Sequence, residues 1–129
     1  MKSILSTLTL VTGILLIAGC ATTSPRDTSL WASLAIDRNQ GRAYGVSYDY
    51  PSAQEADARA IKECGVGCHV VKNFTAGCGA YAADQARNGK ASGWGTASTE
   101  AEAKSIALNY CRQYGGTNCI IRVWSCNSH

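Results

Sequence analysis

The chain has 129 residues, of which 46% are hydrophobic and 16% are charged, with 13 glycines and 2 prolines. This length and composition are typical of one small domain with a buried core; they exclude a disordered or collagen-like chain, and no multidomain enzyme is expected. The formal charge of +3 comes from 12 basic and 9 acidic residues that are spread along the sequence. Because they form no basic patch, we expect no nucleic-acid partner.

The first 19 residues have the pattern of an export signal. Lys2 precedes an apolar run without charge, from Ser3 to Gly19, that is too closely bounded for a membrane span. The run ends in Ile17-Ala18-Gly19-Cys20, which resembles the lipobox of bacterial lipoproteins. The resemblance implies cleavage before Cys20 and acylation of its terminus with chains such as palmitate, in which each buried methylene contributes ~0.8 kcal/mol to membrane binding.

Residues 20–29 are expected to form the lipidated cysteine and a tether to a folded domain at residues 30–129. The tether contains nothing apolar to bury. By the same resemblance, Ala21 after the cysteine implies sorting to the outer membrane, with the domain facing the periplasm. Six cysteines then remain in an oxidising compartment, where three disulfides are the default expectation.

The domain is expected to consist of two copies of one unit, because the sequence matches itself at a shift of 47 residues. The shift aligns Ala35-Ile36-Asp37 with Ala82-Ala83-Asp84, and it aligns Cys64 with Cys111. Further matched pairs, some after a small slip, are Ser52 with Thr99, Glu55 with Glu102, Gly45 with Gly93, Cys68 with Cys119 and Cys78 with Cys126.

Each unit is predicted to have the order strand, strand, helix, strand. Capping boxes predict the two helix starts, at Ser52-x-x-Glu55 and at Thr99-x-x-Glu102, and β-branched or alternating segments predict the strands. The sequence thus predicts an α+β domain with a mostly antiparallel sheet of about six strands and two helices on one face. The expected strands span residues 30–37, 43–48, 68–74, 79–84, 92–97 and 119–125.

Both predicted helices carry a narrow apolar stripe made largely of alanine. Because alanine is small, such a stripe lets a helix lie close to a sheet. The stripe is Ala53, Ala56, Ala60, Ile61 and Cys64 in the first helix, and Ala103, Ile106, Ala107, Leu108 and Cys111 in the second, with Tyr110 and Tyr114 nearby.

Six cysteines allow 15 pairings, and the repeat favours those that treat both units alike. The spacings match no common zinc motif and include no Cys-x-x-Cys, so we expect structural bridges and neither a metal site nor a cofactor. The preferred pairs are Cys64 with Cys68, Cys111 with Cys119, and Cys78 with Cys126, the last joining the two units. A close alternative pairs Cys64 with Cys78 and Cys111 with Cys126.

Little in the sequence indicates catalysis. Asp37 and Asp84 occupy equivalent strand ends and suggest a paired carboxylate site, but Asp at such positions commonly accepts backbone amides of the following turn. His69, the one internal histidine, is interpreted as structural. The sequence contains no nucleophile motif and no phosphate-binding glycine loop, so we do not expect an enzyme.

Aromatic residues are the candidate ligand-binding groups. Gly93-Trp94-Gly95 places a tryptophan between two glycines on a predicted strand, which would leave the indole ring unobstructed. Tyr44 and Tyr48 on another predicted strand add aromatic surface. The alternative is that such rings fill the core of a domain with alanine-rich helices, and this applies most strongly to Trp124 in an apolar strand.

The order of motifs along the mature chain resembles a bacterial family of exported domains of unknown function. The shared motifs include Trp-Ala-x-x-Ala-Ile-Asp at residues 31–37, Gly-Trp-Gly at 93–95 and Trp-x-Cys at 124–126. The resemblance covers nearly the whole mature chain, and it implies secretion and a disulfide-braced repeat. It implies no catalytic residue.

Three functional hypotheses follow. The first is a non-enzymatic outer-membrane lipoprotein that binds an envelope protein or secreted toxin, as an inhibitor or immunity factor would. The second is a module that binds peptidoglycan or another glycan by stacking Trp94 and tyrosines on sugar rings. The third is an envelope hydrolase that uses Asp37 and Asp84.

Overall fold

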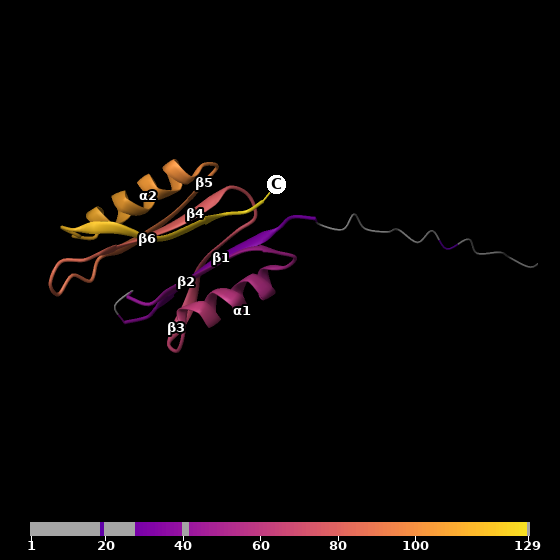
Figure 1. Ribbon diagram of the computed structural model, residues 1–129, viewed down its shortest axis with the longest axis horizontal. Coiled ribbons are helices and arrows are strands. Elements are labelled where there is room, and N and C mark those ends of the chain that lie inside the picture. The colour runs from indigo at the N-terminus through magenta and orange to yellow at the C-terminus, as the bar shows by residue number, and fades with distance from the viewer. Residues whose placement is uncertain (1–18, 20–27, 40–41, 129) are drawn as a thin grey trace, which may run out of the picture.

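The computed structural model describes residues 19, 28–39 and 42–128 (Figure 1). Residues 1–18 of the expected export signal, Cys20 and most of the tether lie outside this part of the chain. Two consecutive ββαβ units confirm the predicted fold class. The first unit contains β1 (Trp31–Asp37), β2 (Tyr44–Tyr50), α1 (Ala53–Cys64) and β3 (Cys68–Phe74), and the second contains β4 (Cys78–Asp84), β5 (Ser92–Ala97), α2 (Glu100–Gln113) and β6 (Cys119–Cys126).

Both helices begin where the capping boxes predict. The Ser52 hydroxyl accepts a hydrogen bond from the N–H of Glu55 at 3.2 Å. The Thr99 hydroxyl accepts one from the N–H of Glu102 at 3.3 Å. Each hydroxyl therefore satisfies an amide that the first helical turn leaves without an intrahelical partner.

The six strands form two three-stranded antiparallel sheets instead of the single sheet expected. The strand order is β2-β1-β3 in one sheet and β5-β4-β6 in the other, so the first strand of each unit is central. Residues 32–36 of β1 and 78–83 of β4 are all buried, which means that each central strand is covered on both faces. A single sheet with both helices on one face would leave its other face in water, and two sheets packed together bury that apolar area.

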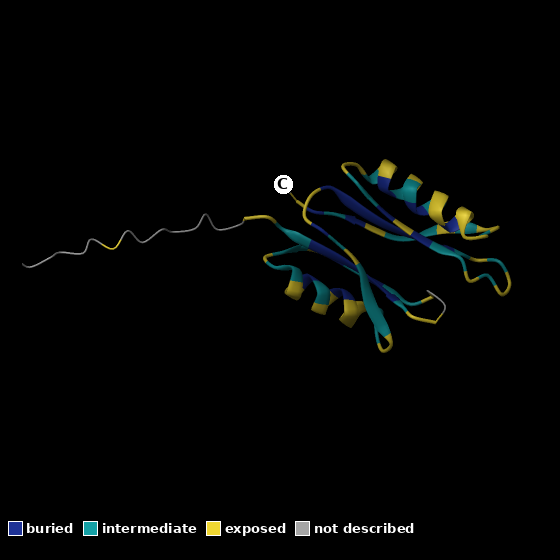
Figure 2. Ribbon diagram, turned by 180° about the vertical axis from the view of Figure 1, so that it is seen from behind, coloured by how far each residue is buried: buried dark blue, intermediate teal, exposed yellow. Residues whose placement is uncertain are grey.

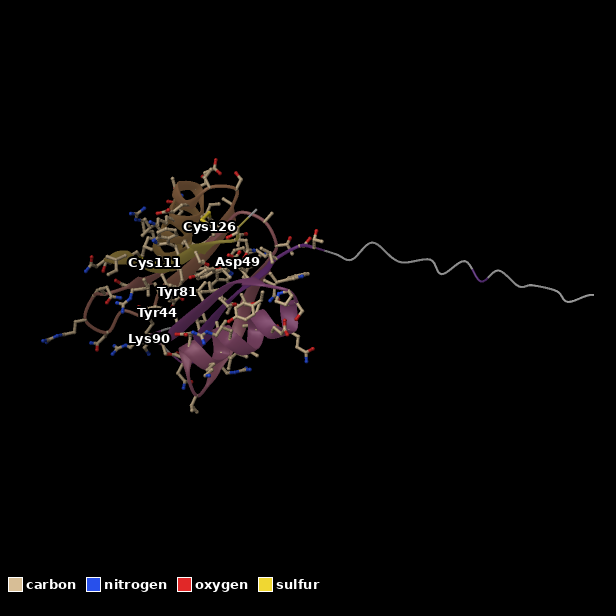
Figure 3. All side chains as sticks on the ribbon, turned by 45° about the vertical axis from the view of Figure 1, so that its right-hand side comes forward. Tyr44, Asp49, Tyr81, Lys90, Cys111 and Cys126 are labelled. Atoms are coloured by element: carbon tan, nitrogen blue, oxygen red, sulfur yellow. A yellow bond between two sulfur atoms is a disulfide. The ribbon has the colours of Figure 1, made fainter. Side chains whose placement is uncertain are left out.

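The molecule has four layers, in the order α1, first sheet, second sheet, α2 (Figures 1 and 2). The core between the sheets consists of Leu34 and Ile36 of β1 with Tyr81 and Ala83 of β4. Tyr44 of β2 lies beside Tyr81, with 5.8 Å between the ring centroids (Figure 3). Burial of a large apolar side chain contributes about 1.5–3 kcal/mol, so this interface holds the two units together.

Glycine and alanine set the short distance between each helix and its sheet. At Gly45 of β2, a Cβ atom would lie 2.1 Å from the carbonyl oxygen of Ala60. At Gly93 of β5, a Cβ atom would lie 2.5 Å from the carbonyl oxygen of Ala107. The helix backbones therefore rest directly on these glycines, whereas Ile61 of the expected stripe is 39% exposed. The fully buried helix residues are Ala56, Ala60, Ala103, Ala107 and Cys111.

Three disulfides brace the fold in the pairing that the repeat favours. The alternative pairing is wrong, since neither Cys64 nor Cys111 bonds to the cysteine that it proposed. The expectation that one bridge joins the two units is also wrong, because Cys78 and Cys126 lie opposite each other on β4 and β6 of the second unit. The bonded pairs are Cys64 with Cys68, Cys78 with Cys126 and Cys111 with Cys119.

The side chain of Asn127, directly after β6, joins the second unit to the first. Its Nδ2 donates to the carbonyl oxygens of Leu30 at 3.0 Å and Phe74 at 3.2 Å. Its Oδ1 accepts a hydrogen bond from the N–H of Asp49 at 3.0 Å. Hydrogen bonds from the Ser128 hydroxyl and amide to the Asp49 carboxylate lower the pKa of that carboxyl. One buried amide therefore links three segments of the first unit to the end of the second.

Replacement of Gly45 by alanine tests the close helix contact. The new methyl group would overlap the Ala60 carbonyl, so we expect the free energy of unfolding to fall by about 1–3 kcal/mol, the usual cost of overpacking. Urea unfolding of the disulfide-intact chain measures this change. Ala58→Ser at an exposed position of α1 is the control, with an expected change within about 0.5 kcal/mol. Equal stability of the two variants would contradict the contact.

Replacement of Asn127 by alanine tests the link between the units. The change leaves the part-buried carbonyl of Leu30 and the buried carbonyl of Phe74 without this donor. We expect the free energy of unfolding to fall by about 1–3 kcal/mol, the usual cost of an unsatisfied buried group. Thermal unfolding provides the measurement. Ser128→Ala removes only the exposed hydrogen bond from the Ser128 hydroxyl to Asp49 and should cost less. If the two variants unfolded alike, Asn127 would not be the link.

Candidate functional site

An exposed aromatic hollow lies at the edge of the second sheet. It has a volume of about 270 Å³ and is lined by Gly93 and Trp94 of β5 with Tyr110 and Tyr114 at the end of α2. The exposed fraction is 37% for Trp94, 46% for Tyr110 and 72% for Tyr114. Clustered exposed apolar side chains mark interaction sites more often than single ones do. We call these four residues the aromatic hollow.

The end of α2 supplies two of the rings. Tyr110 and Tyr114 are four residues apart, so they lie one turn apart on the same side of the helix. The N–H of Tyr114 donates to the carbonyl of Tyr110 at 3.0 Å, which closes the last turn. The absence of a side chain at Gly93 lets Tyr110 pack against the strand, because a Cβ atom at Gly93 would lie only 2.7 Å from the Tyr110 Cβ.

Gly93 and Gly95 have a structural role beyond the one that the sequence suggested. They let α2 pack closely on β5, since a Cβ atom at Gly95 would lie 2.6 Å from the Cβ of Ile106. Side chains alternate along a strand, so Trp94 lies on the opposite face, level with its partner Tyr81 on β4. Tyr110 and Tyr114 line the aromatic hollow from the face that α2 covers, and Trp94 lines it from the opposite face. The aromatic hollow therefore extends across the free edge of β5.

β5 is the least protected of the four edge strands. Its six residues carry no charged side chain and no proline, and its pairing with β4 has no register shift. The pairings that involve β2, β3 and β6 each contain a register shift. These strands also carry Asp49, Lys72 and Arg122, respectively. Charges and bulges are the usual means of blocking further pairing at an edge, so β5 is open to another strand.

The structure does not bring Tyr44 and Tyr48 to the aromatic hollow. Tyr44 is half-buried between the sheets, where the Arg122 guanidinium carbon lies 5.4 Å from its ring centroid. Tyr48 is 54% exposed and lines a separate hollow with Arg59 and Glu63. Both tyrosines lie on β2, which belongs to the other sheet, and the sequence pattern did not reveal this division.

Trp124 is exposed instead of filling the core as expected. Its exposed fraction is 44%, and the Lys104 ammonium nitrogen lies 4.3 Å from the ring centroid. Trp124 pairs with Ala80 on the face of the sheet that α2 covers, but β6 is an edge strand. The ring therefore lies at the margin of the helix, where a cation–π contact with Lys104 covers part of it.

Asp37 and Asp84 have the turn role that the sequence favoured. The Asp37 carboxylate accepts hydrogen bonds from the backbone N–H groups of residues 39, 42 and 43 at 2.9–3.1 Å. The Asp84 carboxylate accepts the N–H of Ala86 at 3.0 Å and that of Asn118 at 2.9 Å. The hydrogen bond from Ala86 is the main cause of a lowered pKa at Asp84. Both side chains hold loops at the same ends of equivalent strands.

His69 lies at the start of β3, and its Nδ1 is buried with no hydrogen-bond partner among the residues described. In the described part of the chain, no three His, Cys, Asp or Glu side chains gather closely enough to hold a metal ion. None of the helices within residues 28–39 and 42–128 has the length and apolar character needed to cross a membrane.

Comparison with known proteins gives a family and a fold relative. Protein Rv1269c of Mycobacterium tuberculosis and Protein Mb1300c of Mycobacterium bovis are each 39% identical to this chain over 94 residues, which is 72% of this chain and 68% of each relative. The NMR structure of Rv1813c from Mycobacterium tuberculosis has a TM-score of 0.56 at 19% identity, covers 98% of this chain and 100% of its own, and shares the fold. The family model for a domain of unknown function, DUF4189, matches residues 31–126, and the chain belongs to this family.

Proposed function

We propose that this chain is a non-enzymatic binding module of the bacterial cell envelope. The export-signal pattern of residues 1–19 and the lipobox-like sequence before Cys20 support an outer-membrane lipoprotein whose domain faces the periplasm. Disulfides persist in that compartment, as the three bonded pairs require. The partner is an envelope protein or secreted toxin, and the module acts on it as an inhibitor or immunity factor.

The open edge of β5 is the observation that carries this proposal. A regular, uncharged edge strand accepts an extended peptide as an additional strand, and main-chain hydrogen bonds supply the affinity. The aromatic hollow beside this edge receives an apolar or aromatic side chain of the same peptide, which supplies specificity. The partner therefore presents an extended segment with at least one large apolar residue.

The two disulfides of the second unit favour this mode of binding. The Cys111–Cys119 bond connects the end of α2, where Tyr110 lies, to the start of β6. The Cys78–Cys126 bond connects the other end of β6 to β4, the strand that pairs with β5. A surface that is already ordered loses less conformational entropy when it binds, so more of the contact energy appears as affinity.

A glycan-binding module is the second candidate, and the aromatic hollow is the observation that favours it. Tryptophan and tyrosine rings present a flat apolar face together with a polar group, which suits the faces and hydroxyl groups of sugars. Trp94, Tyr110 and Tyr114 are all at least 37% exposed and border one cavity. Peptidoglycan is the glycan that a module in the periplasm would meet.

Capture of envelope proteins by the immobilised full chain tests the first candidate. Trp94→Lys places a charge at the β5 edge, and we expect it to reduce the recovery of the bound protein by about tenfold or more, as loss of a central contact does. Tyr48→Lys on the β2 edge is the matched control and should retain capture. Quantitative mass spectrometry of the eluates measures both. Equal recovery with the two variants would show that β5 is not the docking edge.

Sedimentation with purified peptidoglycan separates the two candidates. If the aromatic hollow binds a glycan, the full chain pellets with peptidoglycan and Tyr114→Ala reduces the pelleted fraction, whereas Tyr48→Ala does not. Loss of one stacked aromatic contact is expected to weaken binding about three- to tenfold. The protein-binding proposal predicts that the wild-type chain stays in the supernatant.

A further inference from the structure

A second cavity lies where Arg42 and the loop after β4 meet Arg122 of β6. It has a volume of about 390 Å³, and three arginines from separate segments line it. Arg42 precedes β2 in the first unit, Arg87 lies in the loop between β4 and β5, and Arg122 lies in β6. We call this cavity the arginine cleft. Its lining shares no residue with the aromatic hollow.

The arginine cleft has an excess of positive charge. Asp84 is the one acidic residue in its lining, so three guanidinium groups and one carboxylate give a formal charge of +2. That carboxylate already accepts two hydrogen bonds, from the backbone N–H groups of Ala86 and Asn118. The ion pairs among the described residues are Arg59 with Glu63 and Lys104 with Glu100, and neither includes an arginine of the cleft.

Arg122 is held in place before any ligand binds. Its Nη1 donates a hydrogen bond to Oε1 of Gln85 at 2.6 Å, and its guanidinium carbon lies 5.4 Å from the Tyr44 ring centroid. Gln85 also lines the cleft. A guanidinium that already bonds to an amide and packs against a ring loses little conformational entropy when it binds an anion. Its other N–H groups can still donate two hydrogen bonds to one anion.

The backbone of the loop between β4 and β5 is held against the same site. A Cβ atom at Gly89 would lie 2.6 Å from Oδ2 of Asp84, so the loop packs directly on the carboxylate. Asn88 has a φ of 63°, in the left-handed region that Asn adopts more readily than most residues. Asp84 therefore fixes the position of this loop, and the loop in turn places Arg87 in the lining of the cleft.

We propose that the arginine cleft binds a small ligand with a phosphate monoester group. A phosphate monoester carries a charge of about −1.5 to −2 at neutral pH, which complements the cleft, and its oxygens match the fork of N–H donors on arginine. The cavity volume of about 390 Å³ is within the usual range for a small-molecule site. The phosphate belongs either to a soluble metabolite or to the headgroup of a membrane lipid.

Titration of the full chain with glycerol 3-phosphate at constant ionic strength tests the proposal. We expect saturable changes in the NMR signals of residues 84–89, and weakening of about tenfold or more in Arg122→Gln and in the double variant Arg42→Gln with Arg87→Gln, since each removes charge-assisted hydrogen bonds. Arg59→Gln, at an exposed position on α1, removes one positive charge as Arg122→Gln does and should bind as the wild type does. Thermal unfolding of each variant shows whether it is folded.

Two further arms separate the sources of the phosphate. Vesicles of phosphatidylcholine with phosphatidic acid present a monoester headgroup, and vesicles of phosphatidylcholine alone are the reference for binding through the acyl chains. A lipid source predicts tighter binding to the vesicles with phosphatidic acid, by an excess that Arg122→Gln reduces; a soluble source predicts no such excess and binding of glycerol 3-phosphate. Citrate carries carboxylates without phosphate and is expected to bind more weakly. The proposal is overturned if neither phosphate probe binds, if citrate binds more tightly, or if Arg59→Gln weakens binding as much as the cleft variants do.

Discussion

The contact between a glycine of the second strand and the backbone of the following helix recurs in both units, at Gly45 and at Gly93. Such a contact requires small side chains where each helix lies on its sheet, on the sheet face that points away from the other sheet. Alanines of the helices and of β4 meet this requirement. The large apolar side chains of the central strands, such as Leu34 and Tyr81, lie on the inner faces and need a second cover. Each unit supplies that cover for the other, and the four-layer architecture follows from this constraint.

The elements and disulfides could be predicted because their signals are local or repeated. Ser52 and Thr99 cap helices through residues three positions ahead, and the repeat relates Cys64 to Cys111. The division into two sheets depends on which faces meet in space, and the same strand pattern is compatible with one sheet or two. The clearest signal was β4, Cys-Gly-Ala-Tyr-Ala-Ala-Asp, whose small and apolar residues do not alternate with polar ones, as a strand buried on both faces requires. Residues 32–36 of β1 show the same lack of alternation.

The candidate site could be predicted only in part for the same reason. Trp94 was identified from its neighbouring glycines, although those glycines serve to admit α2. The spacing of Tyr110 and Tyr114 was visible in the sequence, but their position beside Trp94 depends on how closely the helix approaches β5. The arginine cleft had no sequence signal, because Arg42 and Arg122 come from different units that meet only in the folded chain.

Amide hydrogen exchange of the isolated chain tests the central claim, that the two sheets bury their central strands and leave the edge of β5 open. The account predicts slow exchange throughout β1 and β4, which are hydrogen-bonded on both sides, and fast exchange at alternate amides of β5, which face solvent. Uniform protection of β5 at the level of β4 would contradict the account, because the edge would then already be covered.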